Sequence, residues 1–396
     1  MKFWGILPEN SVTYFATRDS QVTKEIKSSF IYLYIFCNEY RLIPVPLQQN
    51  LLLLIPPTNH SQIQRKSRDH LLVLLLLQFH MFYQVFRHGD HTPQEFFPTD
   101  KHKEIARQQG YGQLTKLGIQ QQYELGQYMR RRYSHFLSVV YKQCEIFVQS
   151  TDCDHTLMSA QASLAGLYPP TQDQIWNPRI LWQPIPVHTM PLSQDNLLYL
   201  PFSHCPKYKE LLRETFATRD FQRQFKHYKD INNYTLPVWA THGVRTKLIK
   251  LSELLLQAEF GFHKQIQKSR LQGGILLKTL LKHILDARKP SYHQKMVMYS
   301  THAATIAALQ MALNVFNGKL PPHSACHFFE LYQEKNGQYT IEMYYRNNSL
   351  REPHPLTLPG CKFRCPLERF THLVSPILIH YWTRECTELK QSPFLL

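Results

Sequence analysis

Short apolar runs alternate with longer stretches of helical periodicity over most of the chain after residue 80. Three apolar runs of β-strand character each end abruptly in polar residues: Phe82–Phe86, Ile146–Val148 and Met296–Tyr299. Apolar residues at helical spacing predict helices over 114–133, 208–228, 244–262, 276–287 and 304–313. Strands that are separated by helices predict an α/β fold with a mainly parallel or mixed sheet and helices on both faces.

Two further segments refine this picture. Residues 326–333 and 339–345 alternate in strand fashion around Lys335-Asn336-Gly337, which predicts a β-hairpin. Residues 168–202 are rich in proline and predict a packed, irregular excursion.

The N-terminal region, residues 1–80, has no clear place in this pattern. Within it, residues 65–79 join the basic run Arg65-Lys66-Ser67-Arg68 to the apolar run Leu71–Leu77, in the layout of a signal peptide. The segment is internal, so a buried strand or helix is an equal alternative. The apolar runs are too short to span a bilayer, and we expect no stable membrane span.

Charge favours anionic partners in general, since the 396-residue chain carries a formal net charge of +16. No nucleic-acid-binding motif is present, so we expect no nucleic-acid partner. We interpret the triplet Arg130-Arg131-Arg132 as a solvated helix face. The 21 histidines would add charge in an acidic compartment.

The eight cysteines do not form the paired spacing of a zinc site, so we expect no metal and no other cofactor. Four of them lie near the C-terminus, and glycosylation sequons occur at Asn59, Asn233 and Asn347. This combination favours the secretory route, and hence a secreted or lysosomal-lumen protein.

The candidate functional residues lie at or just after the ends of the predicted strands. Arg87 and His88 end the first strand, His155 follows the second, and His302 follows the third. In α/β folds the carboxyl ends of strands carry ligand-binding residues. A guanidinium can hold two phosphoryl oxygens, and a neutral imidazole can attack phosphorus, so the pattern predicts phosphate chemistry.

Several further motifs accompany these residues. They are Phe97-Pro98-Thr99-Asp100, Trp182-Gln183-Pro184-Ile185-Pro186-Val187-His188, Lys268-Ser269-Arg270-Leu271-Gln272-Gly273-Gly274 and Leu358-Pro359-Gly360-Cys361. Together with Arg87-His88-Gly89, they make the chain resemble the histidine acid phosphatases, most closely the prostatic and lysosomal branch. The resemblance implies a phosphatase domain over 81–396, with a small, shortened helical cap inserted at about 165–265.

The resemblance also implies an activity and its residues. Family members hydrolyse phosphomonoesters through a phosphohistidine, without a metal, and are commonly homodimers. His88 matches the nucleophile and His302 the second catalytic histidine, while Arg87, His91 and His155 occupy phosphate-binding positions. The implied disulfides are Cys205–Cys386 and Cys361–Cys365.

Three positions depart from the family pattern. His91 and His155 replace clamping arginines, and Ala303 replaces the aspartate that donates a proton to the leaving group. Histidine has fewer donors than arginine and is charged only in acid. We expect both His91 and His155 to be protonated near about pH 5, which would partly restore a cationic pocket. Asp90 could also reach the leaving group, but we favour a role in shaping the turn. Cys153 is interpreted as a packing residue and not a second nucleophile.

The segment between Asp230 and Asn233 is shorter than in relatives, which shrinks the cap and leaves Cys326 without its usual partner. We therefore predict an acid phosphatase of weak activity. The alternative is a catalytically inactive secreted protein that binds an anion or a protein partner. A third possibility, a phosphoglycerate-mutase-like enzyme that shares Arg-His-Gly, is disfavoured because the flanking motifs match the acid phosphatases.

Overall fold

A computed structural model describes residues 78–94, 108, 110–199, 205–229 and 242–387 of the chain. Five features of the sequence analysis lie outside these ranges: the signal-like residues up to 77, the sequons at Asn59 and Asn233, the motif Phe97-Pro98-Thr99-Asp100, and the shortened segment that begins at Asp230.

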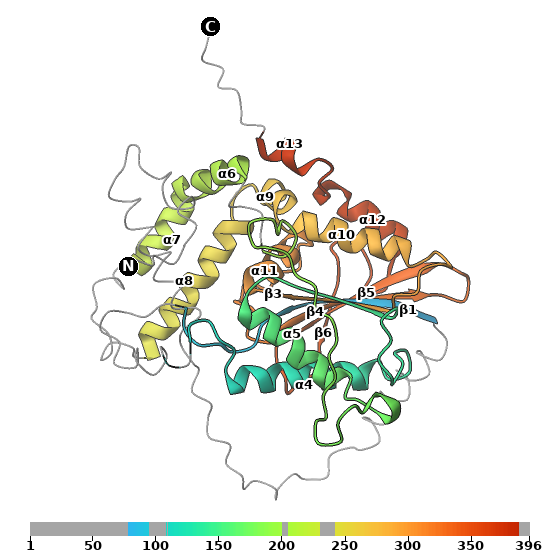
Figure 1. The fold of residues 1–396 in the computed structure, drawn as a ribbon. Coiled ribbons are helices and arrows are strands. Elements are labelled where there is room, and N and C mark those ends of the chain that lie inside the picture. The colour runs from blue at the N-terminus through green and yellow to red at the C-terminus, as the bar shows by residue number, and fades with distance from the viewer. Residues whose placement is uncertain (1–77, 95–107, 109, 200–204, 230–241, 388–396) are drawn as a thin grey trace, which may run out of the picture.

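A mixed sheet forms the centre of the described structure (Figure 1). Its strands run in the order β2-β3-β1-β4-β5-β6, and β7 pairs with β5. The first three strands of this order are parallel, and the pairs from β1 to β4 onward are antiparallel. Their bounds are β1 (Gln78–Arg87), β2 (Ile146–Ser150), β3 (Met296–Thr301), β4 (Cys326–Gln333), β5 (Tyr339–Arg346), β6 (His354–Leu356) and β7 (Cys365–Pro366). The predicted α/β class with a mixed sheet is thus confirmed.

Helices cover both faces of the sheet because successive side chains of β1 point to opposite sides. Phe82 and Phe86 pack with the helices of one face, α4 (Lys116–Arg132) and α5 (Asp154–Leu167). Tyr83 and Val85 belong to the core on the other face. The helices there are α10 (Gly273–Asp286), α11 (Ala303–Ala312) and α12 (Leu367–Val374).

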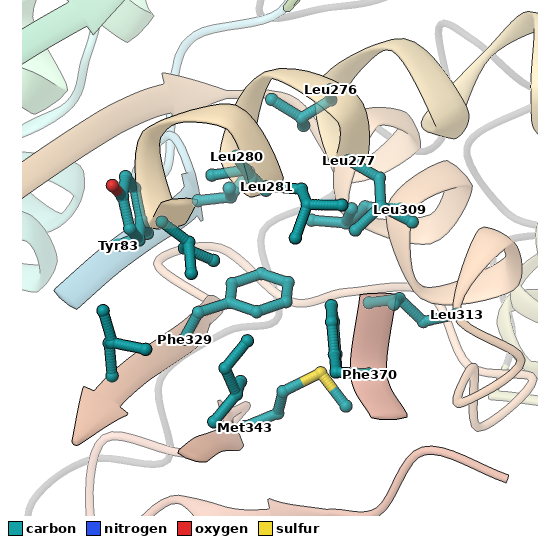
Figure 2. Close-up of a cluster of buried hydrophobic side chains, with 14 of the residues drawn as sticks. Tyr83, Leu276, Leu277, Leu280, Leu281, Leu309, Leu313, Phe329, Met343 and Phe370 are labelled. Atoms are coloured by element: carbon teal, nitrogen blue, oxygen red, sulfur yellow. The ribbon is translucent and has the colours of Figure 1, made fainter. Parts of the chain in front are cut away.

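In the larger core, a row of leucines on α10 packs over the sheet (Figure 2). Leu276, Leu277, Leu280 and Leu281 recur at helical spacing and are all buried above Phe329 of β4. Each such buried side chain contributes about 1.5–3 kcal/mol relative to exposure. This burial anchors the strands whose ends carry the candidate chemistry.

A further group of helices lies beside the sheet. These helices are α6 (Pro206–Ala217), α7 (Arg219–Lys229), α8 (His242–Phe260) and α9 (Gln265–Leu271). The prediction of one helix over 208–228 was wrong, since Thr218 is extended and separates α6 from α7. Its hydroxyl accepts a hydrogen bond from the backbone N–H of Phe221 at 3.3 Å, so the residue caps the second helix.

The remaining described elements are short. They are the 3-10 turns η2 (Gln172–Gln174) and η5 (Ser375–Ile377) and the helix α13 (Trp382–Thr387). Apart from η2, the proline-rich residues 168–199 contain no regular helix, as the sequence predicts. None of the described helices combines the length and apolar character needed to cross a membrane.

The arginine triplet at the end of α4 was misinterpreted as a solvated face. Arg132 lies 2.8 Å from Glu330 in an ion pair, and its guanidinium stacks 4.6 Å from the ring centroid of Tyr344. Arg130 donates to the carbonyl oxygens of Leu137 and Ser138, at 3.0 and 2.9 Å. Arg131 alone is exposed. The triplet therefore joins α4 to its neighbours and carries little of the charge that would attract a partner.

Candidate active site

The sheet brings two of the candidate histidines together directly. In the parallel pair β1–β3, Arg87 stands opposite Thr301, so the residues that follow the two strands are neighbours. The backbone N–H of His88 donates to the carbonyl oxygen of Thr301 at 3.0 Å. The ring centroids of His88 and His302 lie 5.5 Å apart.

His88 lies at the centre of a cluster of imidazoles. Its ring centroid is 4.5 Å from that of His155 and 4.8 Å from that of His91. His155 is not in the strand end but in the first turn of α5, five residues beyond β2. All four predicted histidines thus meet, from segments that span more than 200 residues of sequence.

A fifth histidine, His323, was missed by the sequence analysis. Its ring centroid lies 5.6 Å from that of His88, and it is partly buried. It belongs to the loop before β4, where Ser324 donates its N–H to the carbonyl oxygen of His88 at 3.1 Å. Had the antiparallel pairing of β1 with β4 been predicted, the register would have placed the start of β4 beside His88.

Backbone carbonyls orient three of the rings. Nδ1 of His88 lies 2.9 Å from the carbonyl oxygen of Gly89, and Nδ1 of His155 lies 3.1 Å from that of Gly112. Nδ1 of His91 lies 2.7 Å from the carbonyl oxygen of Thr92. Since a carbonyl only accepts, each Nδ1 carries the proton in these bonds and Nε2 is left with a lone pair.

The Nε2 atoms of His91 and His155 are buried and have no hydrogen-bond partner among the described residues. His302 differs, because its Nε2 lies 3.0 Å from the hydroxyl of Thr151, which in turn lies 2.8 Å from the hydroxyl of Thr156. Two buried ring nitrogens of the cluster can therefore accept a hydrogen bond from a ligand.

The pKa values of these imidazoles are all lowered. Burial, followed by repulsion from His155 and Arg87, holds the pKa of His88 well below its ordinary value. Burial is also the largest cause that lowers the pKa of His155 to about 2 and that of His302 to about 3. The pKa of His91 is lowered by burial and by Arg87.

These directions correct one sequence-based expectation. His91 and His155 were expected to be protonated near pH 5 and to replace the missing arginines as cations. Burial lowers the pKa of both rings, since the pocket removes the charged imidazolium from water. At a pKa of about 2, His155 is neutral at pH 5 and does not supply the expected charge.

Arg87 keeps a fixed charge at the centre of the cluster. Its side chain is buried, and Nη1 donates to the carbonyl oxygen of Pro321 at 2.7 Å. Its charge contributes to lowering the pKa of every histidine of the cluster.

Asp90 shapes the turn that follows β1. Its carboxylate accepts a hydrogen bond from the hydroxyl of Thr115 at 2.6 Å, and its backbone oxygen accepts one from the N–H of Thr115 at 3.0 Å. The other carboxylate oxygen lies 3.5 Å from Nδ1 of His323. These bonds tie the turn to the start of α4, in agreement with the favoured interpretation.

Ala303 is the first residue of α11, directly after His302, and its methyl group has no proton to donate. Cys153 precedes α5, and burial raises the pKa of its thiol to about 11. A thiol with that pKa is a poor nucleophile, which agrees with a packing role. A hollow of about 260 Å³ borders the cluster at His155, and Tyr111, Gly112 and Asp154 help to line it.

Features outside the cluster also match the sequence-based interpretation. The structure contains both disulfides, Cys205–Cys386 and Cys361–Cys365. Cys326 is a buried free cysteine. Asn347 is exposed just after β5, a position accessible to glycosylation.

Comparison with known proteins agrees with the geometry. The sequence model of the histidine phosphatase superfamily (branch 2) matches residues 78–237 and 218–346. The chain belongs to this superfamily. It is 49% identical to prostatic acid phosphatase of Bos taurus over 333 residues, which cover 76% of this chain and 86% of the bovine protein. It is 42% identical to lysosomal acid phosphatase of Homo sapiens over 339 residues, which cover 78% and 80% of the two chains.

Solved structures support the fold. The phytase of Citrobacter braakii superposes with a TM-score of 0.54 at 17% identity, over 79% of this chain and all of the phytase. The apo phytase of Hafnia alvei gives a TM-score of 0.55 at 14% identity, over 78% of this chain and 98% of that chain. At these identities the likeness concerns the fold alone.

Proposed function

We propose that the protein hydrolyses phosphate monoesters slowly through a phosphohistidine on His88. The observation that carries the proposal is the orientation of this ring at the end of β1. With Nδ1 bonded to the carbonyl oxygen of Gly89, the lone pair of the ring is on Nε2. The lowered pKa keeps that lone pair available in acid, where an ordinary histidine would be protonated.

The reaction has two steps. Nε2 of His88 attacks phosphorus, and the bond between phosphorus and the ester oxygen breaks. The guanidinium of Arg87 stabilises charge on the phosphoryl oxygens, while His302 contacts the phosphoryl group. Water then attacks the phosphohistidine, breaks the P–N bond and releases phosphate.

The low rate follows from two losses. Burial lowers the pKa of His91 and of His155, which disfavours the charged form of both rings, so neither is a good replacement for an arginine. Ala303 cannot protonate the leaving oxygen. A missing general acid costs on the order of 10²–10⁴ in rate, and a missing charge-stabilising donor about 10²–10³.

The proposal is tested by trapping the intermediate. The purified protein is mixed with an activated aryl phosphate, quenched in alkali to preserve phosphohistidine, and digested for mass spectrometry. We expect phosphate on the peptide that contains His88, and none in His88→Ala. His293→Ala is the matched control, because His293 is exposed and lies outside the cluster.

A folded protein that yields no phosphopeptide at any pH between about 4 and 8 contradicts the proposal. That outcome would favour the alternative, in which the pocket binds an anion without turnover.

We further propose that the protein acts in a lysosomal lumen or after secretion, as a homodimer whose helices α6 to α8 cap the site. The two disulfides and the names of the prostatic and lysosomal relatives support the location. Glycosylation at Asn347 stays a prediction, which a mobility shift on glycosidase treatment of wild type, lost in Asn347→Gln, would test.

A further inference from the structure

We propose that His88, His155 and His302 form a binding site for a divalent transition-metal ion, with zinc as the best match. One ring nitrogen from each of the three can be chosen so that all lie within 4.8 Å of one another. Three imidazoles around an open fourth position form a ligand set typical of zinc. This inference goes beyond the proposed hydrolysis and does not depend on it.

The geometry is close to that of a zinc site before any ion is bound. Zinc–nitrogen bonds of about 2.0–2.1 Å place the nitrogens of a tetrahedral site about 3.4 Å apart. The widest separation in the cluster is 4.8 Å, so ring shifts of about 1 Å would complete the site. Histidine rings can move by this amount through small χ rotations.

The hydrogen bonds that orient the three rings also suit a metal site. Zinc-binding histidines usually donate their other ring N–H to a carbonyl or another acceptor, which fixes the tautomer and the ring plane. Nδ1 of His88 and Nδ1 of His155 already bond to the carbonyl oxygens of Gly89 and Gly112. His302 is held by the hydroxyl of Thr151.

An independent observation comes from His155. The residue is only 4% exposed, and its Nε2 has no hydrogen-bond partner among the described residues. A buried polar atom without a partner costs about 1–3 kcal/mol, so such atoms in native proteins call for an explanation. Coordination of an ion would satisfy the lone pair of Nε2.

Arg87, the residue before His88, is buried beside the proposed ligands. The charge of Arg87 opposes a bare cation but favours an anion, such as hydroxide or phosphate, in the fourth position.

The histidine at position 155, where the family pattern has an arginine, has two opposite consequences. An arginine there would clamp phosphate and could not act as a ligand, because its guanidinium stays protonated. Histidine removes the clamp and supplies the third ligand. Since the ion would occupy the lone pair with which His88 attacks phosphorus, the metal-bound protein would form no phosphohistidine.

The test measures metal and not activity. Protein prepared without an affinity tag is stripped with chelator and dialysed against Zn²⁺, and bound zinc is counted by elemental analysis. Co²⁺ is added in a parallel sample, where visible absorption reports tetrahedral nitrogen coordination. We expect one high-affinity ion per chain in wild type and in the control His293→Ala. His155→Arg should weaken this site by more than about 100-fold.

A second variant separates loss of the metal ligand from misfolding caused by a large side chain. His155→Gln is smaller than His155→Arg and should lose the ion in the same way, with circular dichroism confirming the fold. If folded wild type binds no zinc, or if folded His155→Arg or His155→Gln retains the ion with unchanged affinity, the proposed site is wrong. Phosphohistidine trapping on metal-free protein remains a separate test, so the two ideas can fail independently.

Discussion

At the scale of single residues, the site differs from an arginine-clamped pocket in charge more than in arrangement. His88, His91, His155 and His302 still meet at the strand ends, with ring centroids of neighbouring pairs 4.5–5.5 Å apart. Burial lowers the pKa of these rings, so the proposed reaction relies on Arg87 for positive charge at the phosphoryl oxygens. The rate we propose is low for this reason.

Ala303→Asp should restore a proton donor at the start of α11. An aspartate in the first turn of a helix is also favoured by the helix dipole, so the fold should tolerate it. We expect hydrolysis of an alkyl phosphate to rise by on the order of 10²-fold, and that of an activated aryl phosphate to rise far less. Steady-state rates on the two ester types check this, and an equal effect on both would contradict the assigned role.

His327 should make the fold sensitive to acid. It is fully buried in β4, where its ring stacks 4.6 Å from that of Phe329, and burial lowers its pKa to about 3. Because this pKa lies below that of the unfolded chain, the unfolded state binds the proton first. The contribution to stability is present above about pH 6.5 and is lost as the pH falls towards 3, at up to about 1.4 kcal/mol per pH unit.

Denaturant unfolding between about pH 7 and 4 measures this dependence. His327→Gln should show a shallower fall in the free energy of unfolding than wild type. The exposed His293→Gln should retain the wild-type slope. Parallel slopes in wild type and His327→Gln would show that the ring is not kept neutral.

Sequence patterns located four histidines because each follows an apolar run or a family motif. They did not locate His323, whose position depends on the antiparallel register of β4 against β1. They also could not reveal the protonation state, since this depends on burial by residues distant in sequence. The expected protonation of His155 near pH 5 was wrong for that reason, since burial lowers its pKa to about 2.

At the scale of elements, the close approach of α4 and α5 holds the site together. A Cβ on Gly126 of α4 would lie 1.9 Å from the carbonyl oxygen of Ser163, and one on Gly166 of α5 would lie 2.2 Å from that of Tyr123. The absence of side chains at these points lets the two backbones nearly touch. Since α5 carries His155, this contact positions one of the clustered rings.

Gly126→Ala should therefore destabilise the protein, even though alanine is the better helix former. Overpacking against a backbone carbonyl costs about 1–3 kcal/mol, and we expect a loss in this range. Gly243→Ala is the matched control, because a Cβ on Gly243 in α8 meets none of the described residues within 4 Å. That variant should be neutral or stabilise by up to about 1 kcal/mol. Equal effects in thermal unfolding would contradict the account of this contact.

The same contact explains why the sequence analysis assigned no helix to 154–167. The buried face of α5 includes Ser159, Ala160, Ser163 and Gly166, which are too small to give a strong apolar pattern. Helices such as α10 were predicted because their buried faces consist of large apolar residues, mainly leucine, at helical spacing. The break at Thr218 was missed because the apolar spacing continues across it.

At the scale of the whole molecule, the Cys205–Cys386 disulfide links α6 to α13 across 181 residues of sequence. A crosslink that closes a long loop restricts the unfolded chain more than one that closes a short loop. The Cys361–Cys365 disulfide closes only 4 residues.

Removing the long-range disulfide should therefore lower the free energy of unfolding more than removing the short-range one. By loop entropy, we expect a loss of about 5 kcal/mol in Cys205→Ala with Cys386→Ala, and of about 2 kcal/mol in Cys361→Ala with Cys365→Ala. Chemical denaturation of both double variants measures the difference. A larger loss in the short-loop variant would mean that local packing, and not chain entropy, sets the contribution of these bonds.

The measurement that tests the central claim most directly is hydrolysis of an activated aryl phosphate by metal-free protein, beside His88→Ala. We expect slow turnover that His88→Ala reduces to background, with no increase from protonation of His155 as the pH falls from about 7 to 5, because burial holds the pKa of this ring at about 2. Equal rates for the folded wild type and His88→Ala would contradict a phosphohistidine route in this protein.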